Sequence, residues 1–454
     1  MKDLSKYSLL AAVVGLAYLI LIYFIGYETP RESFNQFIAL YLAAFTAFYI
    51  LWLNRQNWSF KTFLAIAIIV RLILLFAVPE LSNDFYRFIW DGELITKGVN
   101  PYAHIPNDLV SQDPFYSSQY MKMLWRGMGE LSQSNYSCYP VFNQFLFVIP
   151  AGLFESIQAN VITFKIMMIL GDVGAIYFGK KILEHLKKPS HMIWLYALNP
   201  FVILEFTGNL HFEGIMIFFI LGAVYYIMKN KWMPAALFFA LAIQIKLIPL
   251  IFIPFLFKKL NWRNAIGFTA LTAFVVIGLG MILINEEFYN NIQSSLDLYF
   301  KSFEFNASIF NLFREYSFAT LGYDNVIEDG PFLSKIAFVL IMLLAVFRAV
   351  REDKHIFGGM LFALVIYYLF STTVHPWYIS LVLICSVFTQ YKFGLIWSFV
   401  VMLSYYAYSN LAFEENMLYI TIEYVIVMSI MIFEIIKSTK KSNFGIQIKE
   451  FFQN

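Results

Sequence analysis

Long apolar runs alternate with short polar links along this chain, a pattern that predicts a bundle of membrane-spanning helices. The runs cover residues 8–26, 34–53, 60–79, 141–154, 161–178, 190–207, 213–229, 232–257, 265–284, 332–347, 356–372, 379–389, 393–408 and 417–436. We therefore expect an all-α polytopic membrane protein with about 12 to 14 transmembrane helices. The expected organisation is a single integral membrane domain over residues 1–454.

The basic residues predict which links face the cytoplasm. The strongest cluster lies at 180–188, and its cytoplasmic placement requires the short run 141–154 to be re-entrant or interfacial. Residues 232–257 are too long for one untilted span and are basic at both ends, which predicts two short helices that meet near Lys246. Both termini then face the cytoplasm, and two long external loops, 80–140 and 285–330, are expected to carry short interfacial helices.

Composition narrows the functional classes. The chain is 60% hydrophobic and 14% charged, with 50 Phe and 29 Tyr, which excludes an ordinary soluble domain. A net charge of +2 gives no indication of a nucleic-acid partner. No Walker loop or GxGxxG motif is present, and the six histidines lack metal-ligand spacing, so neither a cofactor nor a metal site is expected. The two cysteines lie far apart in sequence, and no structural disulfide is expected.

The stretch from Ser82 to Tyr102 combines charged and aromatic residues directly after an apolar run. If residues 83–97 are helical, Asp84, Arg87 and Asp91 share one face. A carboxylate face backed by aromatic residues beside a lipid surface is a candidate catalytic site. The alternative is an interfacial helix whose aromatic side chains anchor in the headgroups and whose charges are merely solvated.

The predicted topology brings other polar residues to the same external side. The set is Asp84, Arg87, Asp91, Glu205, His211, Glu213, Glu304, Asn306 and His375. A membrane enzyme that acts on a lipid-linked substrate needs acids or bases at headgroup level and cations for the lipid phosphate. This set supplies both.

Four ionisable residues fall inside apolar runs, where charge is costly and often marks function. For Arg71, Lys165 and Asp172 a structural pair or a snorkelled side chain is the favoured interpretation. Lys246 lies near the predicted helix break, and we expect it to bind phosphate.

Six segments carry a resemblance to a known family: NDFYRFIWDGELITKGVNPYAH at 83–104, YPVFNQ at 139–144, NPFVILEFTGNLHFEG at 199–214, IKLIPLIFIP at 245–254, FEFNASI at 303–309 and VHPWY at 374–378. In this order they resemble the polyprenol-phosphate-sugar-dependent glycosyltransferases of the GT-C superfamily, nearest to the bacterial mannosyltransferase-like branch around family 87. The acidic motif of that family usually follows its first span, whereas two further apolar runs precede it here.

The resemblance implies transfer of a sugar, expected to be mannose, from a polyprenyl-phosphate donor to a glycan, glycolipid or protein acceptor. The reaction would be inverting and metal-independent, at the periplasmic face of the bacterial inner membrane. Asp84 matches the catalytic base of the family, with Asp91 as second choice. Residues expected to bind substrate are Arg87, Trp90, Tyr102, Glu205, His211, Glu213, Lys246, Glu304, Asn306, His375, Trp377 and Tyr378.

Two other functions fit a polytopic chain. A secondary transporter or a flippase for lipid-linked sugars is the main alternative, but transporters usually show internal repeats and short external loops. An O-antigen polymerase or ligase also transfers sugars externally, and we would expect an arginine-rich long loop in it. The external loops here hold only scattered arginines.

Overall fold

The computed structural model describes residues 2–112, 114, 116–297, 303–348, 350, 352–410 and 412–453. Within these ranges the regular elements are helices, and the single β-type contact is an isolated bridge between Phe305 and Thr373. The all-α class expected from the apolar runs is therefore confirmed.

Several helices are long and apolar enough to cross a membrane. Among the residues that the structure describes, six qualify by themselves: α2 (Phe34–Leu53), α9 (Ile157–His185), α15 (Trp262–Gly280), α18 (Val326–Phe347), α19 (Asp353–Phe370) and the Met417–Ser438 part of α22 (Met417–Gln453). A seventh candidate is a bent pair, Pro200–Gly208 with Glu213–Met228, and five shorter apolar helices accompany these. The protein is thus an integral membrane protein, and the figure of about 12 to 14 spans stays a prediction.

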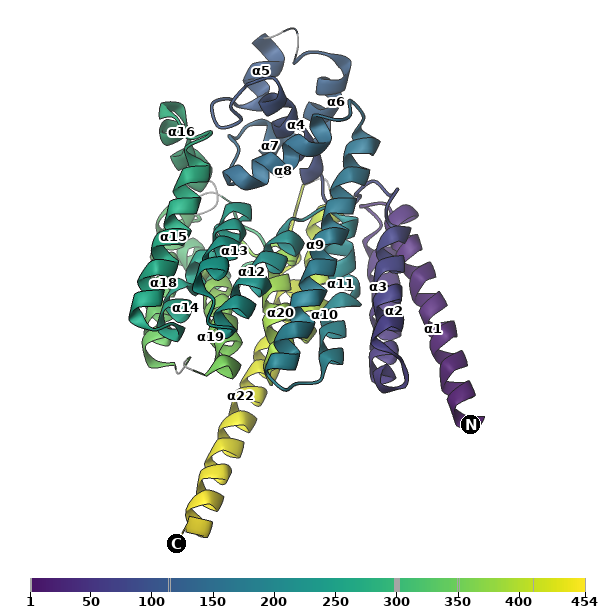
Figure 1. The fold of residues 1–454 in the computed structure, drawn as a ribbon. Coiled ribbons are helices and arrows are strands. Elements are labelled where there is room, and N and C mark those ends of the chain that lie inside the picture. Colours follow the sequence, from purple (N-terminus) through teal and green to yellow (C-terminus); the bar gives the residue numbers. More distant parts are fainter. Residues whose placement is uncertain are drawn as a thin grey trace.

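The N-terminal helices pack against one another. They are α1 (Lys2–Tyr27), α2, the 3-10 turn η1 (Arg55–Asn57) and α3 (Phe60–Ile73). Both α1 and α3 end on the side of the molecule that carries α4 to α8, residues 84–151 (Figure 1). The Ser59 side chain caps α3 by accepting a hydrogen bond from the Thr62 amide at 3.1 Å. At the other end of α3, the Leu74 carbonyl accepts a hydrogen bond from the buried Lys165 ammonium at 2.7 Å. Leu74 thereby links α3 to α9.

The predicted first external loop and the helix that follows it form a helical cap, labelled α4 to α8 in Figure 1. Its helices are α4 (Asp84–Thr96), α5 (Pro106–Gln112), α6 (Gln119–Gly127), α7 (Gly129–Gln133) and α8 (Val141–Ala151). The cap lies at the end of the molecule opposite the start of α1 and the end of α22. With 11 residues, α8 is roughly 16 Å long, about half of a hydrocarbon core. It is too short to span, as expected of an interfacial or re-entrant segment.

A close approach of two backbones fixes α4 on α8. At Gly92 an added Cβ would lie 2.4 Å from the carbonyl oxygen of Phe147, which is shorter than any tolerable contact. Only glycine lets the two helices meet at this distance. The crossing sets the position of the N-terminus of α4, where Asp84 lies.

The apolar run 190–207 was expected to be one of the membrane-spanning helices, but the structure does not form a single helix there. It forms four short pieces: η2 (Ser190–Ile193), α10 (Trp194–Ala197), α11 (Pro200–Val202) and the π-helical turn η3 (Ile203–Gly208). Pro200 lacks an amide hydrogen and starts a new helix, capped by the Asn199 side chain. After η3 the chain bends by 113° into α12 (Glu213–Met228).

The break predicted near Lys246 is confirmed. Helix α13 (Trp232–Ile245) ends there, and Lys246 is extended, with φ −157° and ψ 144°. The short turn η4 (Ile248–Phe252) and α14 (Ile253–Lys259) follow. Pro249 and Pro254 each lack an amide hydrogen and so favour new helix starts over a continuous span.

The remaining helices complete the bundle around one large hydrophobic core. They are α15, α16 (Glu286–Asp297), α17 (Ile309–Leu321), α18, α19, η6 (Pro376–Tyr378), α20 (Ile379–Phe388), α21 (Phe393–Val400), η7 (Val401–Ser409) and α22. The segment 285–330, predicted to be the second external loop, carries α16 and α17, and its residues 298–302 lie outside the described part.

Candidate active site

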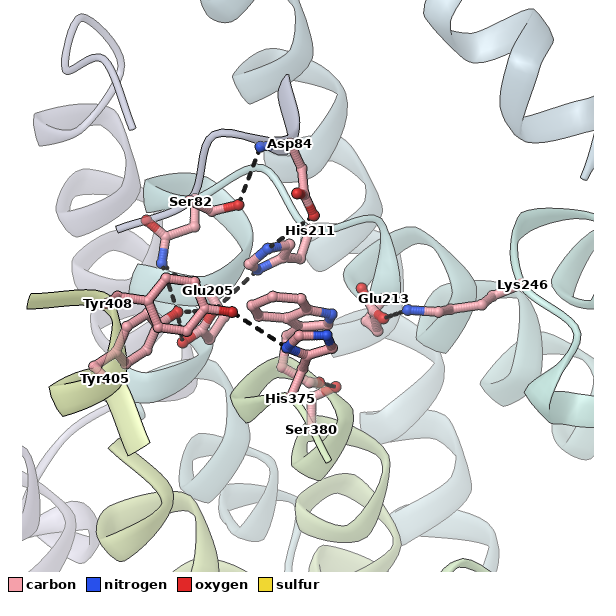
Figure 2. Close-up of polar contacts among 12 residues, drawn as sticks. Ser82, Asp84, Glu205, His211, Glu213, Lys246, His375, Ser380, Tyr405 and Tyr408 are labelled. Carbon is pink, nitrogen blue, oxygen red and sulfur yellow. Dashed lines mark hydrogen bonds and ion pairs between the residues drawn. The ribbon is translucent and has the colours of Figure 1, made fainter. Parts of the chain in front are cut away.

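Asp84 is the first residue of α4 and lies where the cap meets the bundle, above the ring of His211 in Figure 2. Its side chain is 32% exposed. Burial raises the pKa of Asp84, and the nearby charges of His211 and Lys246 oppose that rise. The carboxylate opens into a pocket lined by Asp84, Phe88, Tyr139, Asn143, His211, Phe212, Glu213, Ile245, Lys246 and Trp377.

His211 follows the π-helical turn and lies between two carboxylates. Its Nδ1 is 2.9 Å from Oε2 of Glu205, and its Nε2 is 4.0 Å from Oδ2 of Asp84. The indole of Trp377 stacks on the ring, with centroids 3.6 Å apart. The predicted external tip therefore does bring Glu205 and His211 toward Asp84.

Lys246 provides the cation of the pocket. Its ammonium lies 2.5 Å from Oε1 of Glu213 and 4.3 Å from the centroid of the Tyr378 ring. One third of the side chain, 34%, is exposed. The extended backbone at the helix break lets this side chain reach the pocket, so an anionic group that enters would meet a partly solvated ammonium.

Stacked aromatic rings continue from the pocket into the second half of the chain. Trp377 stacks on His375 with centroids 4.4 Å apart, and Phe305 covers the other side of His375 at 5.0 Å. The hydroxyl of Tyr408 lies 3.3 Å from Nδ1 of His375. Burial holds the pKa of His375 well below its usual value, and the charges of Lys246 and His211 add to this. His375 does not itself line the pocket; it packs against Trp377, which does.

Arg87 and Asp91 do not join the pocket lining. Arg87 Nε donates to Oδ1 of Asp91 at 2.7 Å, and its Nη1 donates to the carbonyls of Ser132 and Asn135 at 2.6 and 2.8 Å. The hydroxyl of Ser137 donates to the other Asp91 oxygen at 2.5 Å. The pair is buried and ties α4 to the end of the cap. Although Asp84, Arg87 and Asp91 were expected to act together, the contacts of Arg87 and Asp91 are structural.

Trp90 and Tyr102 also lie outside the pocket lining. Trp90 is fully buried within the cap, beside Tyr116. The hydroxyl of Tyr102 donates to the carbonyl of Tyr139 at 2.5 Å. Since Tyr139 lines the pocket, Tyr102 supports its wall from behind.

Glu304 and Asn306 belong to a separate network on the second external loop. Glu304 accepts a hydrogen bond from Arg314 at 3.1 Å. Asn306 has a positive φ of 48°, and its amide donates to the carboxylate of Glu423 at 3.2 Å. Phe305, between them, touches His375. This loop therefore holds the aromatic stack, and its polar side chains do not line the pocket.

Sequence reasoning missed several residues at the site. Tyr405 and Tyr408 were hidden in the apolar run 393–408, where tyrosines are typical of an interfacial belt. Asn143 lies in the quoted segment YPVFNQ, but no role was given to it; it lines the pocket, and its Oδ1 has no protein hydrogen-bond partner among the described residues. Arg31 was noted only as a scattered arginine, and its guanidinium lies 4.8 Å from the centroid of the Tyr408 ring.

The three other charged residues in apolar runs, Arg71, Lys165 and Asp172, make structural contacts, which is the interpretation favoured from the sequence. Arg71 Nε donates to Asp172 at 2.7 Å, and the Tyr196 hydroxyl donates to the second oxygen of Asp172 at 2.8 Å. Lys165 holds the end of α3. In the part of the chain that the structure describes, no three His, Cys, Asp or Glu side chains gather as a metal site. Independence of metal stays a prediction.

Comparison with known proteins gives a family. The profile described as alpha-(1->6)-mannopyranosyltransferase, N-terminal domain, matches residues 7–261. Alpha-(1->6)-mannopyranosyltransferase A of Corynebacterium glutamicum is 22% identical over 183 residues, 40% of this chain and 35% of that protein. The enzyme of the same name from Mycobacterium tuberculosis is 22% identical over 220 residues, 46% of this chain and 40% of its own length.

Alpha-(1->6)-mannopyranosyltransferase B of Corynebacterium glutamicum is 24% identical over 149 residues, 33% of this chain and 24% of that protein. The chain thus aligns with less than half of the length of each of these relatives. The family match includes Asp84, His211 and Lys246 and ends before His375. Because residues 7–261 are more than half of the 454-residue chain, the protein belongs to the alpha-(1->6)-mannopyranosyltransferase family.

Proposed function

We propose that this protein is a membrane glycosyltransferase that moves a mannosyl group from a polyprenyl-phosphate donor to a glycan acceptor. The family and the names of its relatives support mannose and an α-(1→6) linkage. The observation that carries the proposal is one pocket with a carboxylate, Asp84, on one side and an ammonium, Lys246, on the other. Inverting transfer from a lipid phosphate requires a base and a cation in this relation.

In the proposed reaction Asp84 acts on the attacking hydroxyl and Lys246 acts on the leaving phosphate. The acceptor hydroxyl attacks the anomeric carbon through an oxocarbenium-like transition state, and Asp84 takes the hydroxyl proton. The new carbon–oxygen bond forms as the bond from the anomeric carbon to the phosphate oxygen breaks. The lipid phosphate leaves with the electron pair, and Lys246 stabilises its charge.

The cytoplasmic ends of the spans are assigned from the basic residues. Lys180, Lys181, Lys187 and Lys188 lie at the end of α9 and just after it, far from the cap. By the positive-inside rule this end faces the cytoplasm, as do both termini, and the pocket faces the periplasm. An acceptor and a lipid-linked donor would then meet at the outer leaflet.

A transfer assay tests this function. Purified protein in nanodiscs is given a radiolabelled short-chain polyprenyl-phosphate mannose and an α-mannoside acceptor, with and without EDTA. Labelled product that forms in EDTA and is absent with Asp84→Asn is the expected result. Movement of the intact donor across a proteoliposome without transfer would overturn the proposal in favour of a flippase.

A further inference from the structure

Glu205 is a fully buried carboxylate with an unusual set of partners. It lies on the π-helical turn η3, where the Tyr405 hydroxyl lies 2.8 and 3.0 Å from its two oxygens and the Asn209 amide donates at 3.4 Å. Among the described ion pairs its basic partner is His211, and no Lys or Arg compensates it. A buried carboxylate is costly unless its environment stabilises the charge, which makes the placement informative.

The contact with Glu205 fixes the orientation of the His211 ring. An ionised carboxylate only accepts hydrogen bonds, so the proton of the 2.9 Å contact lies on Nδ1 of His211. Trp377 covers one face of the ring, and the side chain of His211 is 2% exposed. A half-turn of the ring about its Cβ–Cγ bond would keep the stacking but lose the hydrogen bond at Nδ1, so the contact with Glu205 sets which nitrogen faces which side.

The second nitrogen of the ring is therefore presented to the pocket. Nε2 of His211 is buried and has no protein hydrogen-bond partner among the residues described. It lies 4.0 Å from Oδ2 of Asp84, and both side chains line the same pocket. Buried polar atoms are nearly always satisfied, so a free Nε2 at a pocket wall marks a position for an oxygen of the substrate.

We propose that Glu205 is a positioning residue that locks His211 with Nδ1–H toward Glu205 and Nε2 toward Asp84 and the substrate. This rests on the proposed transferase function only in naming Asp84 as the base. Glu205 itself does not touch the pocket; it acts through the ring. The nearby His211 lowers the pKa of Asp84, so a ring held in this orientation favours the ionised carboxylate that the reaction needs.

Titratable and charged groups around the pocket and the Glu205–His211 pair lie on several elements. They are Asp84 on α4, Glu205 on η3, Glu213 on α12, Lys246 after α13, His375 before η6, Tyr405 and Tyr408 on η7, and Arg31 between α1 and α2. Glu205 is the nearest carboxylate, 2.9 Å from the ring compared with 4.0 Å for Asp84. Its removal should therefore change the ring more than any other single substitution of an acid.

The first test measures the ring directly and needs no activity. Exchange of the imidazole C2 proton for deuterium, followed by mass spectrometry of histidine peptides across pH, gives a midpoint for each histidine. In Glu205→Gln the midpoint for His211 should fall by about one pH unit or more, because the carboxylate charge is lost. An unchanged midpoint in the folded variant would overturn the proposal.

Two controls isolate the effect. His185, which pairs with Asp353 far from the cap, should keep its midpoint in the same sample. Glu423→Gln makes the same chemical change in another buried carboxylate, whose partners are Trp397 and Asn306, and it should leave His211 unchanged. If Glu423→Gln shifts His211 as far as Glu205→Gln does, the effect is general and the proposal fails.

A second variant covers the case in which Glu205→Gln does not fold. Tyr405→Phe removes a donor that competes for the Glu205 charge, so the midpoint of His211 should rise. An unchanged or lower midpoint for His211 in folded Tyr405→Phe would contradict the proposal that Glu205 holds the His211 ring.

Activity then tests the link to Asp84. In Glu205→Gln, the fall of kcat/KM at acid pH should begin at a higher pH than in the wild type. If kcat/KM is instead reduced by the same factor at every pH, Glu205 has a merely structural role. Absence of transfer by the wild-type protein would reject the proposed function, while the exchange experiment would still decide the Glu205–His211 relation.

Discussion

Oδ2 of Asp84 lies 4.0 Å from Nε2 of His211, across the junction between the cap and the membrane bundle. Asp84 starts α4, which packs on α8, and His211 follows the π-helical turn of a broken segment. The distance leaves room for a single oxygen atom to contact both groups. The relation of these two residues therefore depends on how the cap packs on the bundle.

Asp84→Asn is nearly isosteric and removes only the ability to accept a proton. Transfer should fall by about 10²- to 10⁴-fold, the usual contribution of a general base. Donor binding and the thermal unfolding temperature should stay near the wild-type values, since Asp84 forms no close ion pair with Lys or Arg among the described residues. Transfer at the wild-type rate would remove Asp84 from the mechanism.

Asp91→Asn serves as the matched control and should behave in the opposite way. It leaves the buried guanidinium of Arg87 without its counter-charge, and breaking such a pair costs about 3–5 kcal/mol. Unfolding should therefore occur at a clearly lower temperature, while turnover per folded molecule is largely kept. A stable but inactive Asp91→Asn protein would instead make Asp91 the base.

Lys246→Ala should weaken donor binding. A hydrogen bond to a charged group contributes about 1.5–3 kcal/mol, so the Kd for a short-chain polyprenyl-phosphate mannose should rise roughly ten- to a hundredfold. Lys122→Ala removes the same charge from an exposed position on the cap, on α6, and should leave the Kd unchanged. Equal affinity of the wild type and Lys246→Ala would show that the phosphate binds elsewhere.

The pH profile should report the surroundings of Asp84. Because burial raises its pKa, the base becomes protonated as the pH falls through a value above the usual range of about 3.9, and kcat/KM declines there. The His211 charge lowers this pKa, so His211→Gln should move the acid limb to still higher pH. The check is kcat/KM between about pH 4 and 9; a limb that moves to lower pH contradicts this electrostatic account.

Gly92→Ala should disturb the packing of α4 on α8 in the cap. The new methyl group would lie 2.4 Å from the carbonyl oxygen of Phe147, and overpacking of this kind typically costs about 1–3 kcal/mol. Both the unfolding temperature and transfer should fall, because α4 carries Asp84. Gly278→Ala, with no atom within 4 Å of the added Cβ, should leave both unchanged. Unaltered transfer in Gly92→Ala would show that the position of Asp84 tolerates movement of α4.

Local sequence predicted two structural features that position the site. Helix 83–97 and the break near Lys246 follow from apolar patterning, prolines and turn residues, which act within a few positions. The same signals could not show that Arg87 is bound to Asp91, because i,i+3, i,i+4 and i,i+7 neighbours all share a face of α4. Tyr405 was missed because a tyrosine in an apolar run looks alike whether it faces lipid or a buried carboxylate.

The sequence by itself determined the class of protein and the helix break near Lys246, and it predicted a set of external polar residues. These depend on hydrophobicity and backbone propensity, which are properties of short segments. Only the tertiary structure decided which of those residues meet: Asp84, His211, Glu213 and Lys246 at the pocket, Glu205 behind His211, and Arg87 with Asp91 apart. The reason is that such contacts join distant segments, and they depend on how α4, η3 and the break after α13 pack together.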